Sequence, residues 1–150
     1  MPVNSEPAGP NPSASAVMVC ADEAQKDIAQ ILGVTATQVT QPTWVDHVYS
    51  CKYVYPNGAI TVSVKELSTP AETKAYFDQT AQTLGRRPGT VPLGEDAFHT
   101  TNGSLVVRKD YKVLEVDVSE VPEHFGKVAL TPDLVALNVG EVIMGCWVGA

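Results

Sequence analysis

The sequence has few basic side chains and no basic cluster. Lys and Arg number 10 against 17 Asp and Glu, which gives a formal net charge of −7. Arg86-Arg87 is the one basic pair, and such a pair is typical of a solvated loop. An acidic chain without a basic patch is not expected to bind nucleic acid or an anionic membrane surface. No apolar run approaches the roughly 20 residues that a membrane-spanning helix needs.

Signatures of catalysis and of cofactor binding are also missing. The chain has no nucleophile elbow, phosphate-binding loop, dinucleotide fingerprint or zinc-protease motif, and its His, Cys, Asp and Glu residues lack the spacing of metal ligands. We therefore expect a domain that is not an enzyme and that has no cofactor and no metal. The alternative is a hydrolase that uses His99 and Glu115. An exposed histidine beside a carboxylate is the simpler interpretation of that pair.

What is present is the composition of one globular domain. The chain has 150 residues, of which 44% are hydrophobic and 18% are charged, which is enough for a sizeable core. Residues 1–16 are rich in Pro, Ser, Asn, Gly and Ala and are predicted to form a flexible tether, followed by a single α+β domain over 17–150. The start lacks the basic and apolar regions of a signal peptide. The chain is therefore either cytosolic or the mature part of an exported protein.

The stretch from Trp44 to Leu67 is predicted to form a β-hairpin. Asn57-Gly58 predicts a type I′ turn between two β-prone runs, because both residues tolerate a positive φ. With these two residues as the loop, Tyr53 lies opposite Val62. Apolar residues then gather on one face of the hairpin and polar residues on the other.

A three-stranded meander is predicted further along the chain. Asn102-Gly103 predicts a second type I′ turn, which places Phe98 opposite Val107. A turn at Asp110-Tyr111 then places Val107 opposite Leu114. The predicted apolar face consists of Phe98, Leu105, Val107, Leu114, Val116 and Val118, and the opposite face of His99, Val106, Arg108, Glu115 and Asp117.

Helix signals flank both groups of strands. The first helix is predicted over 21–32 and ends at Gly33, the second begins after the N-cap Thr69 and ends at Gly85, and the third follows Thr131-Pro132. The order is helix, two strands, helix, three strands, helix. We therefore predict an α+β fold in which three helices pack on one or both faces of an antiparallel five-stranded sheet.

Three cysteines, Cys20, Cys51 and Cys146, leave at least one thiol unpaired in a monomer. Three free thiols would indicate a reducing compartment, and one disulfide an exported protein. We favour a Cys20–Cys51 disulfide, which closes a loop of about 30 residues and is worth on the order of 3 kcal/mol. The rival pairing is Cys20 with Cys146.

Aromatic side chains with polar ends suit a ligand pocket between sheet and helix. They suit an ordinary core equally well, so both interpretations stay open. The residues proposed for the pocket are Tyr53, Tyr55, Tyr76, Phe77 and Trp147.

Several motifs together resemble short actinobacterial cell-envelope proteins. They are a cysteine that opens the first helix and the segments Leu32-Gly33, 49–53, 93–98, 105–109 and 144–147. Many of those proteins are lipoproteins of unknown function, and they are distantly similar to extracellular sensor domains of mycobacterial serine/threonine kinases. The resemblance covers residues 17–149. It implies an exported domain tethered to the membrane by its N-terminal linker. Together with the flexible start, the cysteine count and the missing catalytic motifs, it favours a non-enzymatic domain that binds a small ligand or an envelope protein and touches the membrane only through an N-terminal lipid anchor. A structural scaffold without a pocket is the remaining alternative.

Overall fold

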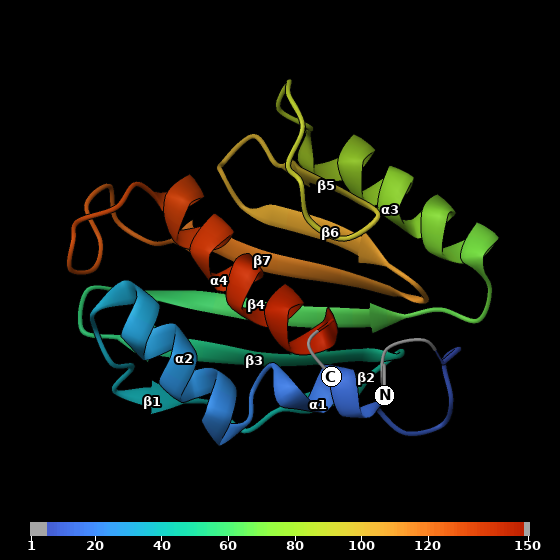
Figure 1. The fold of residues 1–150 in the computed structure, drawn as a ribbon, viewed down its shortest axis with the longest axis horizontal. Helices are drawn as coiled ribbons and strands as arrows, with labels where there is room; N and C mark the ends of the chain where they lie inside the picture. The colour runs from blue at the N-terminus through green and yellow to red at the C-terminus, as the bar shows by residue number, and fades with distance from the viewer. Residues whose placement is uncertain (1–5, 149–150) are drawn as a thin grey trace.

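The protein consists of an antiparallel sheet with helices on both of its faces (Figure 1). Its computed structural model describes residues 6–148. The helices are α1 (Ala14–Met18), α2 (Asp22–Leu32), α3 (Pro70–Leu84) and α4 (Pro132–Val148), and the strands are β1 (Gln38–Val39), β2 (Thr43–Val45), β3 (Val48–Tyr55), β4 (Gly58–Glu66), β5 (Asp96–His99), β6 (Leu105–Lys109) and β7 (Lys112–Glu120). The strand order is β1-β3-β4-β7-β6-β5, and β2 also pairs with β3. The predicted α+β class is confirmed. The predicted numbers are wrong, because the described residues form seven strands and four helices.

The additional strands are too short to leave an alternating pattern in the sequence. β1 pairs with the end of β3 and β2 with its beginning, along the same edge. β2 and β3 are joined by a two-residue turn, Asp46-His47, in which both residues have positive φ, 53° and 60°. The type I′ geometry is thus found at a turn that the sequence does not mark with glycine.

The β3–β4 turn lies one residue earlier than predicted, which shifts the strand register by two residues. Its loop is Pro56-Asn57, so that Tyr53 lies opposite Ile60 rather than Val62. Proline has no N–H for a strand ladder, but its fixed φ suits the first position of a turn, and this explains the shift. The predicted register is wrong. The face assignment survives, because a shift of two residues returns each side chain to the same side.

The pairing of β5 with β6 differs by one residue, and the consequence is larger. Phe98 lies opposite Val106 rather than Val107. The loop is longer than a two-residue turn, and it is closed by a hydrogen bond from Thr100 N to Ser104 O at 2.8 Å. A slip of one residue turns every side chain of β5 to the other face. The next pairing was predicted correctly, with Val107 opposite Leu114.

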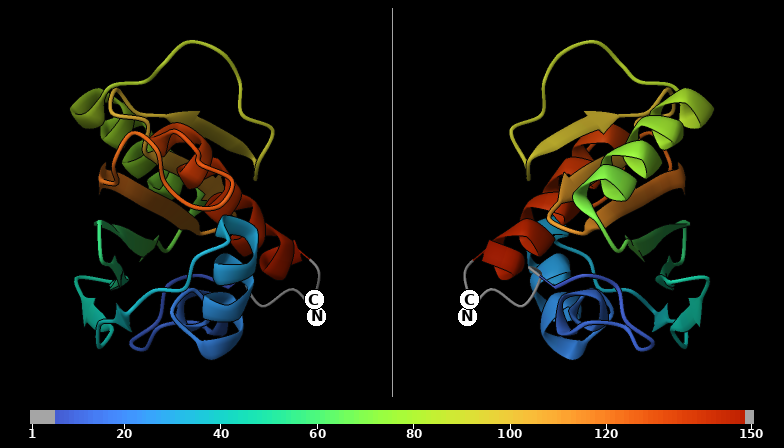
Figure 2. Two further views of the ribbon diagram at one scale, coloured as in Figure 1. Left: turned by 90° about the vertical axis from the view of Figure 1, so that its left-hand side faces the viewer. Right: turned by 90° about the vertical axis from the view of Figure 1, so that its right-hand side faces the viewer.

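The helices divide between the two faces of the sheet. α1, α2 and α4 lie on one side and α3 on the other (Figure 2). The larger core lies under α2 and α4. The smaller core lies under α3, where Phe77 and Phe98 meet edge to face with ring centroids 5.1 Å apart. Phe98 was predicted for the larger core and is in the smaller one because of the register slip.

The N-terminal segment is attached to the domain over residues 6–16. Ala8 N donates to Leu67 O at 2.8 Å. Ser13 caps α1, and its hydroxyl and backbone N–H both donate to the buried carboxylate of Glu66. This differs from the flexible tether predicted for 1–16. Residues 1–5 of that prediction lie outside the described residues.

Candidate functional site

The five aromatic residues proposed for a pocket do not come together. Tyr53 and Trp147 are buried in the larger core, where their polar ends hold α1: Tyr53 Oη donates to Val19 O at 2.7 Å, and Trp147 Nε1 donates to Ser15 O at 3.0 Å. Phe77 is in the smaller core, on the other side of the sheet. Tyr76 is exposed on α3. Of the five, Tyr55 alone lines the pocket described below.

His99 and Glu115 lie on opposite faces of the sheet. His99 is opposite Leu105 on β6, and Glu115 is opposite the adjacent residue, Val106. Neighbouring residues of a strand point to opposite sides. His99 Nδ1 lies 3.0 Å from Gly103 O. The geometry therefore does not assemble the pair that the hydrolase alternative requires.

The favoured disulfide is confirmed. Cys20 and Cys51 are bonded, with Cα atoms 6.2 Å apart, and Cys146 is free. The disulfide joins the segment between α1 and α2 to the middle of β3. A structural disulfide of this kind persists in an oxidising compartment.

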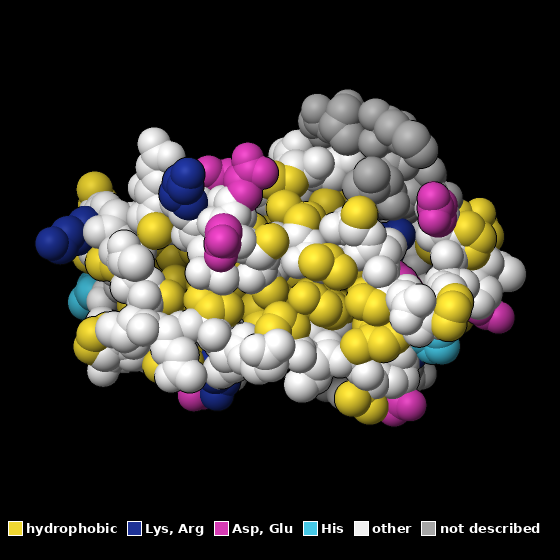
Figure 3. All heavy atoms as spheres, turned by 90° about the horizontal axis from the view of Figure 1, so that it is seen from below, with side chains coloured by type: hydrophobic (Ala, Val, Ile, Leu, Met, Phe, Trp, Pro, Cys, Tyr) yellow, Lys and Arg dark blue, Asp and Glu magenta, His cyan; other side chains and the backbone are white. Residues whose placement is uncertain are grey.

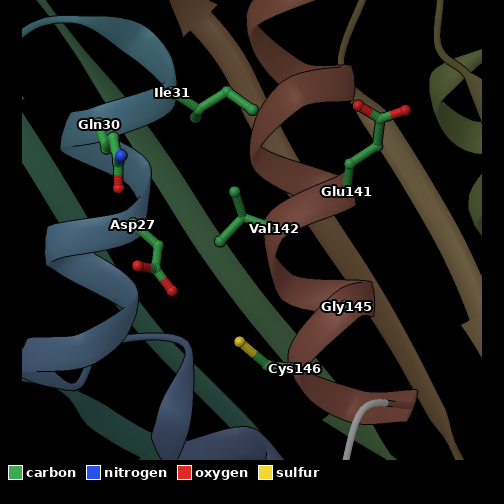
Figure 4. Close-up of a pocket in the computed structure, with 7 residues that line it drawn as sticks. All are labelled: Asp27, Gln30, Ile31, Glu141, Val142, Gly145 and Cys146. Atoms are coloured by element: carbon green, nitrogen blue, oxygen red, sulfur yellow. The ribbon is translucent and has the colours of Figure 1, made fainter.

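A groove of about 550 Å³ lies between α2 and α4 (Figure 4). Ile31 and Asp27 of α2 face Val142 and Cys146 of α4 across it, whereas Glu141 points away from α2. Burial raises the pKa of Cys146, and the carboxylates of Asp27 and Glu23 raise it further. The thiol therefore stays protonated at neutral pH, and a protonated thiol is a weak nucleophile.

A second cavity, which we call the turn pocket, has a volume of about 440 Å³. It is lined by the β3–β4 turn, and that turn lies at one end of the sheet (Figure 1). Three segments form it: the loop after α2, the β3–β4 turn and the loop before α4. The lining residues are Gly33, Val34, Thr35, Thr37, Tyr55, Pro56, Asn57, Phe125, Gly126 and Lys127.

Two glycines allow the walls of the turn pocket to meet. Gly33 ends α2 with φ 71°, and Gly126 has φ 87°. Lys127 N donates to Leu32 O at 2.8 Å. A Cβ atom at Gly126 would lie 2.6 Å from Leu32 O, and one at Gly33 would collide with Lys127 O. The pocket therefore depends on backbone-to-backbone contact that larger residues would prevent.

Two buried aromatic rings form the inner end of the pocket. Tyr55 and Phe125 meet edge to face, with centroids 4.9 Å apart. Phe125 is fixed by two backbone hydrogen bonds with Leu130, at 2.9 and 2.7 Å. Burial raises the pKa of Tyr55 to about 12, so its hydroxyl remains a donor at neutral pH. That hydroxyl makes no hydrogen bond among residues 6–148, and its oxygen is not one of the fully buried unpaired atoms there, which are Ser15 Oγ and Arg108 Nε.

Three further polar side chains of the pocket are free to bind a ligand. Thr35, Asn57 and Lys127 make no side-chain hydrogen bond or ion pair within the described part of the chain. Thr37 is different, because its hydroxyl donates to Val54 O at 3.0 Å. A concave pocket with several converging polar groups is the preferred candidate for a ligand site.

Few features of the sequence indicate this pocket. Gly33 was recognised as a helix end, and Tyr55 was proposed as a pocket residue on its aromatic character. Thr35, Asn57 and Lys127 are missing from the predicted site because they lie on three separate segments. The one signal that could have found them is the glycine at both contacting backbones, Gly33 and Gly126.

A third feature is an apolar band on the surface near α1, β1 and β2 (Figure 3). Partly buried Met18 and Val39 pack against the core from these elements, and Val17 and Val45 are exposed, Val45 by 63%. Exposed apolar surface of this kind can mark a protein interaction site.

No protein-family model, curated protein or solved structure matches this chain. Between residues 6 and 148, no helix has the length and hydropathy to cross a bilayer. In the same residues, no group of three or more His, Cys, Asp or Glu side chains could hold a metal ion.

Proposed function

We propose that this protein is a non-enzymatic binding domain, exported to the cell envelope, that holds a small ligand in the turn pocket. The observation that carries the proposal is the pocket itself. Its walls meet through close backbone contacts at Gly33 and Gly126, and the polar side chains of Thr35, Tyr55, Asn57 and Lys127 make no hydrogen bond or ion pair among the described residues. The side chains of Thr35, Asn57 and Lys127 are exposed, so a ligand can bind them without breaking a hydrogen bond or an ion pair of the described residues.

Export is supported by the Cys20–Cys51 disulfide and by the resemblance to actinobacterial envelope lipoproteins. The position of the pocket fits an N-terminal lipid anchor. The N-terminal segment is bonded to Glu66, at one end of β4, and the turn pocket lies beside Gly58, at the other end. Eight strand intervals of about 3.3 Å separate these ends by about 26 Å. The pocket thus lies about 26 Å along β4 from the point where the N-terminal segment binds Glu66.

The ligand-binding proposal is tested by nuclear magnetic resonance of the ¹⁵N-labelled protein against cocktails of small polar metabolites. We expect at least one cocktail to shift the amide signals of 33–37, 55–57 and 125–127. Tyr55→Phe keeps the ring and removes the hydroxyl, and it should weaken binding without changing the fold. The control is Asp27→Asn in the α2–α4 groove, which should leave the affinity unchanged. If no cocktail moves the signals of the pocket, ligand binding there is refuted.

The export proposal is tested by alkylating the protein as it is isolated from its native cells, followed by mass measurement. The alkylation is carried out in denaturant, so that buried thiols also react. We expect one alkylated cysteine, Cys146, before reduction and three after it. Detection of three alkylated cysteines before reduction would contradict export.

Binding of an envelope protein is a second candidate function, and the apolar band favours it. Val45→Glu places a charge on β2, one of the elements near the band, and should abolish a cross-link to a partner in the cell envelope. The matched control is Leu134→Glu on α4, which is exposed but lies outside the elements of the band. Equal loss or equal retention of the cross-link in both variants would argue against the band.

A further inference from the structure

We infer that the turn pocket takes a small polyhydroxylated molecule with one anionic group, the chemistry of a sugar acid. The inference rests on the proposed function and adds the class of ligand. It draws on three observations, which are the charge of the lining residues, the kinds of polar group they offer, and the volume of the pocket.

The charge of the lining is opposite to that of the whole protein. The chain has a formal net charge of −7, yet Lys127 is the one charged residue that lines the pocket, and no Asp or Glu lines it. Lys52 and Lys74 are engaged in ion pairs, whereas the ammonium group of Lys127 has no such partner among residues 6–148. An anionic group beside Lys127 would therefore meet a free cation and no competing carboxylate.

The end of α2 decides how such a ligand is oriented. Gly33 closes this helix, and the C-terminal end of a helix carries partial negative charge. An anionic group is disfavoured beside it, whereas a hydroxyl can donate to its carbonyl oxygens. The anionic group is therefore expected near Lys127, and the hydroxyl groups toward Thr35 and the end of α2.

The uncharged side chains match hydroxyl groups. The hydroxyl of Thr35 and the amide of Asn57 can both donate and accept, and Tyr55 keeps its proton as a donor. Tyr55 and Phe125 are almost fully buried, so they offer little ring surface for stacking. Recognition would depend on hydrogen bonds. The volume of 440 Å³ is near the small end of ligand sites, about 300–1,000 Å³, and favours a single ring over an extended chain.

The test compares three probes of the same size: D-glucuronate, D-glucose and D-glucosamine, which are anionic, neutral and cationic. Each is titrated into the ¹⁵N-labelled protein, and the shifts of 33–37, 55–57 and 125–127 are followed. We expect D-glucuronate to bind about tenfold more tightly than D-glucose, which is the effect of one charge-assisted hydrogen bond. D-Glucosamine should bind the most weakly.

Lys127→Gln should remove about tenfold of the affinity for D-glucuronate and leave that for D-glucose unchanged. Lys26→Gln, which removes an exposed lysine of α2 outside the pocket, should change neither affinity. The amide spectrum of each variant shows whether it is folded. Tyr55→Phe should weaken binding of both sugars.

Two other results would overturn the inference, the first its anionic group and the second its ligand class. If D-glucose binds as tightly as D-glucuronate, or if Lys127→Gln has no effect, the anionic group is excluded and the pocket remains a sugar site. If none of the three sugars moves the pocket signals at millimolar concentration, the ligand class is wrong. The metabolite cocktails then decide separately whether the pocket binds any ligand.

Discussion

Reduction of the Cys20–Cys51 disulfide should lower the free energy of unfolding by about 3.7 kcal/mol. The bond joins residues 31 positions apart, and the chain-entropy relation gives this value for a loop of that length. Small domains are usually stable by about 5–15 kcal/mol, so the reduced protein should remain folded but lose a large fraction of its stability.

Urea unfolding of the wild-type protein with and without a thiol-free phosphine reductant measures this effect. With a denaturant dependence of about 2 kcal/mol per molar, the midpoint should fall by about 1.5–2 M urea. Fluorescence of the buried Trp147 reports the loss of the larger core. Cys146→Ala should show the same difference between the oxidised and reduced forms, because Cys146 takes no part in the bond.

The double variant Cys20→Ala/Cys51→Ala should lose at least as much stability as reduction does. Both cysteines are buried, so removing their sulfur atoms also leaves space in the core. Unfolding curves that coincide with and without reductant would refute the assigned pairing and, with it, the stabilising role of the loop closure.

Three further predictions concern the walls of the turn pocket, the smaller core under α3 and the free thiol of Cys146. Gly33→Ala should destabilise the protein in thermal unfolding by more than the ~1–2 kcal/mol that an alanine in the left-handed conformation costs, because its Cβ also collides with Lys127 O. The control is Gly89→Ala, measured in the same way: Gly89 has φ +100° and open space around it, so this variant isolates the cost of the backbone conformation. Phe98→Ala should lower stability by about 3–5 kcal/mol in urea unfolding, since the ring is fully buried against Phe77; a loss under 1 kcal/mol would contradict the register found for β5. Alkylation of Cys146 should be slow at pH 8 and should accelerate as the pH rises toward the elevated pKa of the thiol. Asp27→Asn should speed alkylation at pH 8, because removing a carboxylate that raises the pKa increases the thiolate fraction. An unchanged rate would show that Asp27 does not act on the thiol.

The sequence predicted the long elements well, because each has a repeated pattern and a marked end. Helix α2 ends at Gly33 and helix α3 begins after Thr69, as their caps indicate. The pairing across Asp110-Tyr111 was also predicted correctly. These signals are local, so they do not depend on which distant segments pack against them.

Registers were predicted less well, because turn residues alone do not fix the length of a loop. Asn57-Gly58 and Asn102-Gly103 both indicated type I′ turns, and neither pair forms the two-residue loop of its hairpin. Pro56 moved the first loop by one residue, which shifted the register by two residues and preserved the faces. The second shift, of one residue, moved Phe98 to the other face and separated His99 from Glu115.

The candidate site was the least predictable part. The N-terminal segment is polar and rich in proline, so composition alone suggests a tether, yet Ser13 binds the distant Glu66. Likewise, the turn pocket is formed by segments that are far apart in the sequence and are brought together by Gly33 and Gly126. Contacts between distant polar segments leave no periodic pattern that a sequence could display.

The way in which β1 and β2 share one edge of β3 has a consequence for solubility. Thr40 bridges the space between them, since its N–H donates to Lys52 O and its hydroxyl accepts from Lys52 N, both at 2.9 Å. The outer rim of the sheet thus consists of two short pieces interrupted by Pro42, and proline cannot donate to another strand. A neighbouring copy finds no long, regular ladder there on which to add, which should discourage fibril growth even in a crowded compartment.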